Sequence, residues 1–515
     1  LGFRMVDGQV VGEVKGSQPA PFTVVVKLPY RDADAADAVL RWLADTDGAA
    51  DAFARGELPD KRLDELLVAD DEEPAPRCSC PDPHPACKHV VAVIAAAAQA
   101  LDSEPMNALE LRGVGVHEAK HRLAALAAGA TVFSMLTAQL TFLAYGTTAR
   151  ASRAFGRGDV RGAVAEGVQA TWVAVFVGAI LLALVEVFAG GITRLLTPDA
   201  DVATAAAGWL RIAAFGIPLT LVAQAGNGWM RGVQDTRRPF LYVVGGLGPA
   251  ALCIVPLVGW LGLDGSAWAM IMGETITAAL FLRKLAVSAS AQDVDKRPRW
   301  TLIKRQLVLG RDLILRSLAF QVAFLSAAGV AGRLGAFSLG GHQILLQLWN
   351  LLSLVLDSLA IAAQTLVGAA LGVGSVAAAR FTARRVIAWS TVFAGVLAVA
   401  FAVLHGVLPG LFTSSDGVIA AIAEGPWWIL VAMIPIGGVV FAIDGVLLGA
   451  GDAAFLRNAT ITAVVLGFLP PVWLTPSMGW GLTGVWWGLL TFMLLRLVFV
   501  AVRYRGPKWA VAAGE

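Results

Sequence analysis

Beyond about residue 122 the chain alternates long apolar stretches with short polar segments. Each stretch holds roughly 20 residues, the length that an α-helix needs to cross a bilayer core of about 30 Å. Such a stretch must be helical in lipid, because the bilayer offers no hydrogen-bond partner to an unpaired backbone amide. The pattern predicts an all-α polytopic membrane protein with about eleven transmembrane helices, at residues 122–147, 167–190, 203–229, 239–261, 265–284, 311–334, 339–370, 386–412, 426–449, 458–478 and 483–502.

Residues 1–113 have a different pattern, with short apolar segments and many charged residues. The β-branched run Phe22–Pro29 predicts a strand. Residues 33–67 have helical spacing, residues 69–86 predict a proline-containing loop, and Val90–Leu101 predicts a further helix. We therefore expect a small α+β domain ahead of the membrane region.

Composition supports the membrane assignment, because only 15% of residues are charged and 57% are hydrophobic, whereas soluble domains have about 25% charged residues. The net charge of +2 indicates no particular partner beyond the lipid bilayer. The first thirty residues hold no apolar run behind a basic start, so no signal peptide is predicted. The chain begins with Leu1 rather than methionine, so we expect a longer natural chain or a non-standard start codon.

Basic residues gather in every second loop of this pattern. By the positive-inside rule these loops lie in the cytoplasm, and so does the C-terminus. We therefore expect a multi-pass protein of the plasma membrane, the inner membrane of a bacterium, with a cytoplasmic C-terminus. The residues concerned are Arg150, Arg153, Arg157, Arg161, Arg231, Arg237, Arg238, those between Arg283 and Arg311, Arg380, Arg384, Arg385, Arg457, Arg503, Arg505 and Lys508.

The membrane region contains an internal repeat. Three motifs recur in the same order at offsets of 216–219 residues, which indicates duplication. Both copies have their basic loops on one side, so the copies are parallel and related by an axis along the membrane normal. The pairs are Pro218-x8-Asn227-Gly-x3-Gly232-x2-Asp235 with Pro435-x8-Asp444-Gly-x3-Gly449-x2-Asp452, Gly156-x-Gly158-Asp159 with Gly372-x-Gly374-Ser375, and Gly262-Leu-x-Gly265-x2-Trp268 with Gly481-Leu-x-Gly484-x2-Trp487.

The repeat predicts a first bundle at residues 114–285, a cytoplasmic linker at 286–310 and a second bundle at 311–515. The second bundle has six predicted helices. The offset would put the opening helix of the first bundle near residues 94–117, where a central charge costs about 2.5–3.5 kcal/mol. The first bundle is therefore expected to have five helices and to lack its opening helix. The polar residues of that stretch are Asp102, Glu104, Glu110, Arg112 and His117.

Ionisable residues inside apolar helices are costly and are candidates for function. Asp357, Asp444 and Glu274 are such residues, and Asn227 stands at the repeat position of Asp444. We interpret them as candidates for binding a coupling ion, and helix-to-helix hydrogen bonding as the alternative. Three glutamines are further candidates for lining a cavity, with helix packing as the alternative: Gln139, Gln224 and Gln343.

A cluster of cysteines precedes the membrane region. Cys78, Cys80, Cys87 and His89 have the spacing C-x-C-x6-C-x-H, and three thiolates with one imidazole suit tetrahedral Zn²⁺ at a structural site. The alternative is an oxidisable loop. Eleven helices and a cytoplasmic C-terminus would put this cluster outside the cell, although reduced cysteines suit the cytosol.

A second motif, His117-Glu118-Ala-Lys-His121, matches the H-E-x-x-H helix of zinc metalloproteases, with Glu118 as the general base. A membrane metalloprotease is therefore the enzyme alternative. It is disfavoured, because no third ligand is evident and the repeat accounts for the helices without it.

The membrane region resembles the multidrug and toxic-compound extrusion (MATE) antiporters, in particular their DNA-damage-inducible branch. The resemblance implies two six-helix bundles around a cavity, no enzyme activity, and export of amphipathic or cationic compounds in exchange for H⁺ or Na⁺. It also implies an ion-coupling aspartate in the first helix, which has no counterpart here. The matching stretches are Phe142–Arg150, Gly228–Arg237, His342-Gln343, Leu356–Gln364 and Phe441–Asp452.

The cysteine cluster resembles the SWIM zinc finger, and the flanking stretches Val14–Thr23 and Ala100–Gly113 resemble the surroundings of that finger. The resemblance implies contact with nucleic acid or protein, although no basic patch with interleaved aromatics is visible. The alternatives to an exporter are therefore a membrane-tethered zinc-finger interaction module and an inactive fusion without transport.

Overall fold

The computed structural model describes residues 2–6, 8–15, 20–29, 72–82, 84, 87–103, 107, 111, 116–423 and 425–510. The chain divides into two compact units, one formed by residues 1–128 and 196–206 and the other by residues 129–195 and 207–515.

The N-terminal unit contains a four-stranded antiparallel sheet in the order β1 (Gly2–Val6), β2 (Gln9–Val14), β3 (Phe22–Lys27) and β4 (Ala75–Cys78), with helix α4 (Lys88–Ser103) packed against it. Side chains alternate between the faces of a strand, so Val24 and Val26 of β3 point to one side. They form a core with Val90 and Val93 of α4. Strand β3 and helix α4 confirm the strand and the helix predicted at residues 22–29 and 90–101.

The prediction of a continuous loop at residues 69–86 was wrong, because β4 lies within it and pairs with β3. The sequence did not predict this strand, because proline and acidic residues, which are rare in strands, occur in and before it. Pro76 has no amide hydrogen, and such a residue is tolerated in an edge strand, which β4 is among the described strands. Strands β1 and β2 were not predicted. The helix expected at residues 33–67 lies outside the described residues.

The described membrane region consists of helices joined by short connections. It has ten helices long and apolar enough to cross a membrane, or eleven if the pair α9 and α10, bent by 40°, is one span. This confirms the expectation of about eleven. The helices are α6 (Val116–Gln139), α7 (Phe142–Gly156), α8 (Val160–Leu196), α9 (Ala200–Ala214), α10 (Gly216–Gly232), α11 (Arg237–Leu261), α12 (Leu263–Ala291), α13 (Trp300–Arg333), α14 (Ala336–Gly372), α15 (Val376–Val403), α16 (Asp416–Ala423), α17 (Pro426–Gly449), α18 (Ala453–Ala463), α19 (Leu469–Met478) and α20 (Gly481–Arg505), with short turns at Leu404–Gly406, Pro409–Leu411 and Val464–Phe468.

The predicted ends of several spans were wrong, because helices continue beyond the apolar core. Helix α13 begins at Trp300 rather than at residue 311, and its first turns are held by Gln306, which donates hydrogen bonds to Glu166 of α8. The predicted span 386–412 overran helix α15, which ends at Val403 before two 3₁₀ turns. Only span 426–449 was predicted with both ends correct.

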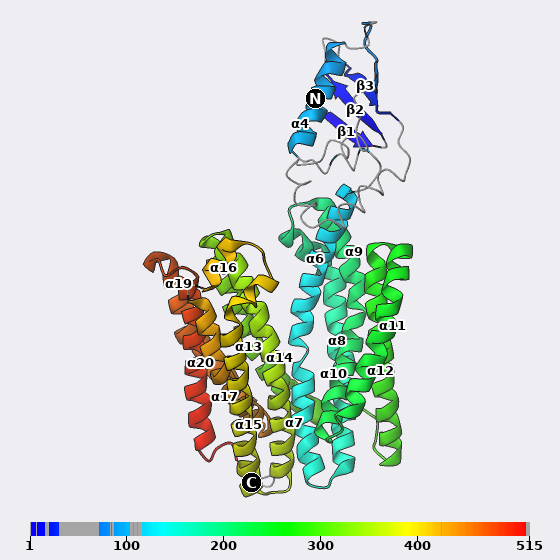
Figure 1. Ribbon diagram of the computed structural model, residues 1–515. Helices are drawn as coiled ribbons and strands as arrows, with labels where there is room; N and C mark the ends of the chain where they lie inside the picture. The colour runs from blue at the N-terminus through cyan, green and yellow to red at the C-terminus, as the bar shows by residue number, and fades with distance from the viewer. Residues whose placement is uncertain are drawn as a thin grey trace. The chain divides into compact units, whose positions relative to one another are not determined.

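The helices form two bundles, one with α7, α8, α10, α11 and α12 and the other with α13, α14, α15, α17 and α20 (Figure 1). The repeat reappears in their packing. Gly228 of α10 lies against the backbone of Ala144, and Gly445 of α17 lies against the backbone of Ala360, at offsets of 217 and 216 residues. Glycine permits such close helix contacts.

The turns between helices repeat as well. Gly158 and Gly374 have φ of 74° and 86°, a region that glycine adopts without strain. The next residue caps the following helix in each case. Asp159 Oδ1 accepts from the amide of Gly162 at 2.7 Å, and Ser375 Oγ accepts from the amide of Ala378 at 3.2 Å. The repeated glycine motif is therefore a helix end, a turn and an N-cap.

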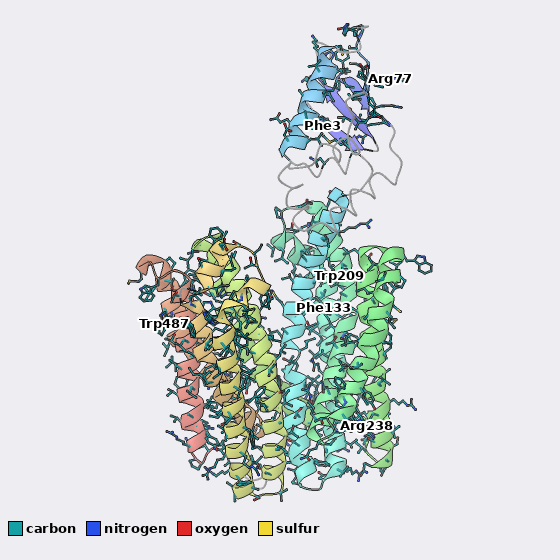
Figure 2. All side chains as sticks on the ribbon, viewed as in Figure 1. Phe3, Arg77, Phe133, Trp209, Arg238 and Trp487 are labelled. Atoms are coloured by element: carbon teal, nitrogen blue, oxygen red, sulfur yellow. The ribbon has the colours of Figure 1, made fainter. Side chains whose placement is uncertain are left out.

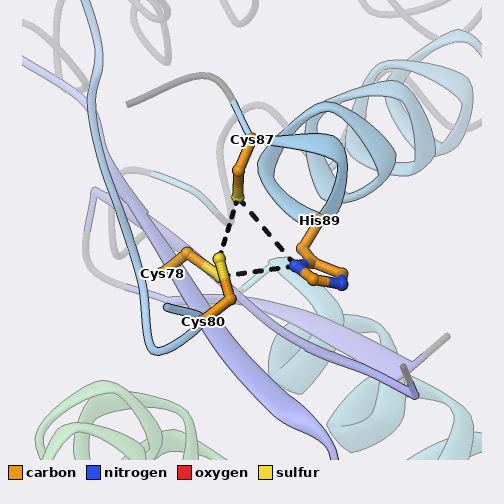
Figure 3. A group of neighbouring side chains, drawn as sticks. All are labelled: Cys78, Cys80, Cys87 and His89. Carbon is orange, nitrogen blue, oxygen red and sulfur yellow. Dashed lines mark hydrogen bonds between the residues drawn. The ribbon is translucent and has the colours of Figure 1, made fainter. Parts of the chain in front are cut away.

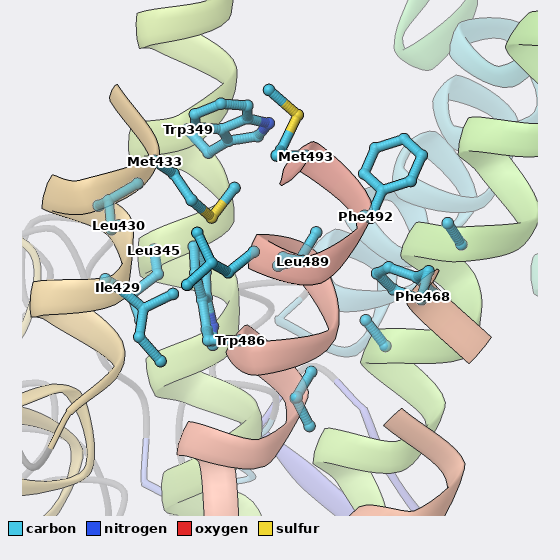
Figure 4. Close-up of a cluster of buried hydrophobic side chains, with 14 of the residues drawn as sticks. Leu345, Trp349, Ile429, Leu430, Met433, Phe468, Trp486, Leu489, Phe492 and Met493 are labelled. Carbon is cyan, nitrogen blue, oxygen red and sulfur yellow. The ribbon is translucent and has the colours of Figure 1, made fainter. Parts of the chain in front are cut away.

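Large apolar side chains cover the outside of the bundles. Leu252 and Trp260 are 81% and 89% exposed, and Trp487, which Figure 2 labels, is 49% exposed. Apolar surface of this extent suits contact with lipid rather than water. Inside the second bundle, Trp427, Trp486 and Phe468 are almost fully buried in a large apolar core, part of which Figure 4 shows.

Candidate functional site

A cavity of about 660 Å³ lies between the two bundles, within the size range of small-molecule sites. Helices α6 and α7 line one side, and helices α13, α14, α17 and α20 line the other. Much of the lining is apolar and aromatic, and Trp349, Met433, Leu489, Phe492 and Met493 of Figure 4 belong to it. Its polar residues are Gln139, Thr141, Tyr145, Arg316, Ser317, Gln321, Asn350, Ser353, Asp357, Gln364, Asp444 and Arg496.

Two hydrogen bonds join α7 and α14, which belong to different bundles, beside this cavity. The hydroxyl of Tyr145 in α7 donates to Asp357 Oδ2 in α14 at 2.5 Å. On the same helix, Gln364 Nε2 donates to the backbone oxygen of Tyr145 at 2.6 Å. Arg316 and Arg231 also interact with Asp357 electrostatically. Asp357 is thus a cavity carboxylate whose hydrogen-bond donor is a neutral hydroxyl from the other half of the repeat.

A second carboxylate in the cavity has a different environment. Asp444 Oδ2 forms ion pairs with both Arg316 of α13 and Arg496 of α20. The three side chains are 5%, 15% and 3% exposed, in the order Asp444, Arg316 and Arg496. Ionised groups at membrane depth persist when they are paired, and the group of three carries one net positive charge.

Aromatic rings pack against the guanidinium groups of Arg316 and Arg496. Arg496 lies 5.0 Å from the ring centre of Phe320 and 5.5 Å from that of Phe492. Arg316 lies 5.7 Å from the ring centre of Phe320. A cation over an aromatic face is attracted by the negative charge of that face, so these rings stabilise the two arginines.

Helices α7 and α14 are in close contact at their C-terminal ends. Gly156 lies against the backbone of Ala369, and Gly372 lies against the backbone of Arg153. Arg153 also donates to the carbonyl oxygens of Gly449, at 3.2 Å, and Ala450. It thereby links α7 to the C-terminal end of α17, whose free carbonyl groups attract a cation.

The other predicted candidates lie in different places. Gln139 lines the cavity, and among the described residues its Oε1 has no hydrogen-bond partner. Gln343 is exposed on α14 and is not part of the cavity lining. In the first bundle, Glu274 of α12 hydrogen-bonds with Thr220 of α10. Asn227 also lies there, and no described residue reaches its Oδ1 with a hydrogen bond.

The N-terminal unit brings Cys78, Cys80, Cys87 and His89 together, with all four potential ligand atoms within 4.8 Å of one another (Figure 3). The sulfurs of Cys80 and Cys87 are 3.6 Å apart. His89 Nδ1 lies 3.9 Å from Cys78 Sγ and 4.0 Å from Cys87 Sγ. A tetrahedral zinc site with Zn–S bonds of about 2.3 Å has sulfur–sulfur edges of about 3.8 Å, so this arrangement fits a single zinc ion.

The surroundings of the cluster change the acidity of its thiols. Burial raises the pKa of Cys78 to about 11. Burial acts on Cys87 as well, but hydrogen bonds with the amides of Val90 and His89 and with the Cys80 thiol outweigh it and lower the pKa of Cys87. Metal ligation requires thiolates, and the start of α4 supplies the amides that favour one.

The structure adds residues that the sequence did not single out. Tyr145 lies within the matching stretch Phe142–Arg150 but was not predicted as a site residue, and Arg316 and Arg496 were not predicted as partners of Asp444. The sequence signal for the arginines was their position in apolar helices, since a charge there needs a partner. The side chains of the H-E-x-x-H motif, His117, Glu118 and His121, lie outside the described residues.

The family description MatE matches residues 114–256 and 313–473, which together make up more than half of the chain. The chain belongs to the MatE family. Members of this family are multi-pass membrane transporters rather than enzymes. This confirms the predicted transporter family and the absence of enzyme activity, and it removes the metalloprotease alternative.

Known members show how far the similarity reaches. The chain is 33% identical over 305 residues to "Protein DETOXIFICATION 44, chloroplastic" of Arabidopsis thaliana, covering 57% of this chain and 56% of that MatE relative. It spans just over half the length of the plant relatives it matches. It is 27% identical over 397 residues to "DNA damage-inducible protein F" of Escherichia coli, covering 74% of this chain and 84% of that protein.

The fold agrees with that of solved MatE proteins. The structure described as "MATE in the bent conformation" superposes with a TM-score of 0.69 at 20% identity, covering 75% of this chain and 88% of that one. At this identity the likeness concerns the fold alone.

Proposed function

We propose that this chain is a secondary active exporter that exchanges amphipathic compounds, cationic ones among them, for H⁺ or Na⁺. The observation that carries the proposal is the cavity between the bundles, which combines a large apolar and aromatic lining with a few charged groups. Such a lining binds the apolar body of a drug-sized compound, and the charged groups orient it. The likeness to a protein of the DNA-damage-inducible branch supports the assignment to that branch.

Asp357 is the proposed site of the coupling ion. An exchanger needs a carboxylate whose affinity for a cation differs between its two conformations. Asp357 meets this need, because its hydroxyl donor Tyr145 comes from the opposite bundle and moves away when the bundles separate. Asp444 is less suited, because two arginines already neutralise it.

Alternating access requires a contact that opens and closes. The crossing of α7 and α14 is the proposed gate on the side of the basic loops, since Gly156 and Gly372 allow the two backbones to touch there. Arg153 holds this gate by binding the end of α17. In the predicted topology, with the basic loops and the C-terminus in the cytoplasm of a bacterium, the closed side faces the cytoplasm.

Five spans are proposed for the first bundle and six for the second. The repeat offset supports this count, because helix pairs α6–α7 and α14, α8 and α15, α11 and α18–α19, and α12 and α20 correspond across it. The position of the opening span of the first bundle then falls on the α4 region.

Dye export from cells that express the chain tests the proposed function. An exporter lowers the steady-state content of a fluorescent amphipath when an inward gradient of H⁺ or Na⁺ exists, and an ionophore abolishes the effect. Asp357→Asn is expected to abolish it at unchanged surface expression, whereas Asp295→Asn, an exposed carboxylate of the linker, leaves export intact. Export that depends on neither the H⁺ gradient nor the Na⁺ gradient contradicts the proposal.

A second proposal concerns the N-terminal unit, where Cys78, Cys80, Cys87 and His89 bind one structural Zn²⁺ as a SWIM-type finger. The tetrahedral spacing of three sulfurs and one imidazole nitrogen supports it. Bound zinc would tie the end of β4 to the start of α4 and so stabilise this small core. Metal analysis of the purified chain tests it. His89→Ala is expected to lose the zinc, and the neighbouring His84→Ala to retain it.

A further inference from the structure

Two poles of opposite charge line the same cavity. The acidic pole is Asp357 with the Tyr145 hydroxyl. The basic pole is the group Arg316, Asp444 and Arg496, with one net positive charge. Both poles line one cavity of about 660 Å³, which is the size of a site for a drug-sized ligand, so one small molecule can reach both.

The acidic pole is open to a cation. Among the ion pairs of the described residues none includes Asp357, although Arg316 and Arg231 contribute to its field. Its hydrogen bond comes from a neutral group. A cationic group placed beside it gains an attraction that Asp444, already paired twice, does not offer.

The basic pole has unused donor capacity. Both arginines line the cavity, but Arg316 is 15% exposed whereas Arg496 is only 3% exposed. A guanidinium group has five donors, and Arg316 pairs with Asp444 through its Nη2 nitrogen, so the group has donors beyond those of this pair. A carboxylate that enters the cavity can therefore bind Arg316 without breaking the pair of Asp444 with Arg496.

The aromatic rings also favour a ligand cation at the acidic pole rather than near the basic pole. Phe320 and Phe492 face the guanidinium groups of the protein itself. A cationic ligand gains little at a ring whose face already holds a cation. Its charge is therefore directed toward Asp357 rather than toward the aromatic wall of the second bundle.

From these contacts we propose that the cavity takes zwitterionic amphipaths, with the substrate carboxylate on Arg316 and the substrate cation at Asp357. This rests on the proposed export function and names its substrate class. It also gives a reason for exchange, because the cationic end of the substrate and the coupling ion compete for one carboxylate. A compound with only a positive charge uses one pole and leaves Arg316 without its second partner.

Three dyes with the same fused ring system test the proposal. A rhodamine ethyl ester is a cation, its free acid is a zwitterion, and fluorescein is an anion. Binding of each to the purified full-length chain in detergent is measured by fluorescence anisotropy, with protein-free micelles subtracted. We expect the free acid to bind at least about tenfold more tightly than the ester and than fluorescein, because a charge-assisted hydrogen bond contributes that much.

Variants locate the effect. Arg316→Gln is expected to bring the affinity for the free acid down to that for the ester and to leave the ester unchanged. Arg316→Lys keeps part of the preference, because it keeps the charge but not the fork of donors. The control is Arg311→Gln on the same helix, which is 60% exposed and outside the cavity lining. Equal affinity of the wild-type chain for acid and ester overturns the proposal, and this comparison needs no variant.

Transport of the same dyes in proteoliposomes separates this proposal from the export function. If acid and ester undergo gradient-driven transport with equal affinities, the zwitterion preference is overturned and the proposed export function remains supported. A preference for the acid in binding, lost in Arg316→Gln, without any gradient-driven transport supports the two-pole site and contradicts the exporter.

Discussion

Asp444 is the counter-ion of two buried arginines, and replacing it by asparagine tests that role. Its side chain is 5% exposed, and those of Arg496 and Arg316 are 3% and 15% exposed. The variant Asp444→Asn therefore leaves two cations with little access to water. Removing one partner of a buried ion pair costs about 3–5 kcal/mol, because the remaining charge stays desolvated. We expect a loss of unfolding free energy of about that size.

A second substitution sharpens the test. In the double variant Asp444→Asn with Arg496→Gln, the deepest uncompensated charge is gone, so the double variant is expected to be about 1–3 kcal/mol more stable than Asp444→Asn alone. The control is Asp452→Asn, whose pair with Arg503 is 2.6 Å long and more exposed, at 15% and 23%. It should cost less.

The assay is the apparent melting temperature of the purified full-length chain in one detergent at one heating rate, because irreversible unfolding makes that temperature depend on the rate. An Asp444→Asn variant that melts with the wild-type chain refutes the counter-ion role. So does a double variant that is no more stable than the single one.

Other consequences concern packing, zinc and the gate. Gly445→Ala is expected to lower the free energy of unfolding by about 1–3 kcal/mol, because a Cβ would collide with the facing carbonyl oxygen of α14. The control Gly395→Ala, whose Cβ would meet no atom within 4 Å, should not destabilise the protein, and equal melting temperatures of the two variants would contradict the close contact. Cys87→Ser should reduce the zinc content from about one ion per chain to nearly none, and retained zinc in metal analysis would contradict the ligand set. Arg153→Ala should open the contact between α7 and α14, measured as faster labelling of a Ser152→Cys variant by a water-soluble thiol reagent; unchanged labelling would contradict its role in the gate.

Hydropathy and the repeat predicted most of the membrane fold, because each span is a local property of the sequence. Span 426–449 was predicted with both ends correct, since Pro426 and Gly449 lie at the two ends of an apolar stretch whose only charged residue is Asp444. The start of α13 was missed, because its first turns are polar and pack against α8 through Gln306. Strand β4 was missed for a similar reason, since its pairing with β3 is not visible in its own residues.

The cavity was predictable only in part. Asp357 and Asp444 were identified as costly charges within apolar helices, which is again a local property. Their partners are not local, since Tyr145 is 212 residues from Asp357, and Arg316 and Arg496 are 128 and 52 residues from Asp444. No spacing rule distinguishes a carboxylate bound by a hydroxyl from one bound by two guanidinium groups. Only the packing of α7, α13, α14, α17 and α20 makes that difference.

The central claim is that a cation gradient drives transport through this cavity by way of Asp357. The most direct measurement is uptake of the rhodamine free acid into proteoliposomes under an imposed H⁺ or Na⁺ gradient, for the wild-type chain and for Asp357→Asn. The account predicts that uptake depends on the gradient in the wild-type chain and is lost in Asp357→Asn, while the variant still melts as a folded protein. Gradient-driven uptake that persists in Asp357→Asn, or its absence from the wild-type chain, would contradict it.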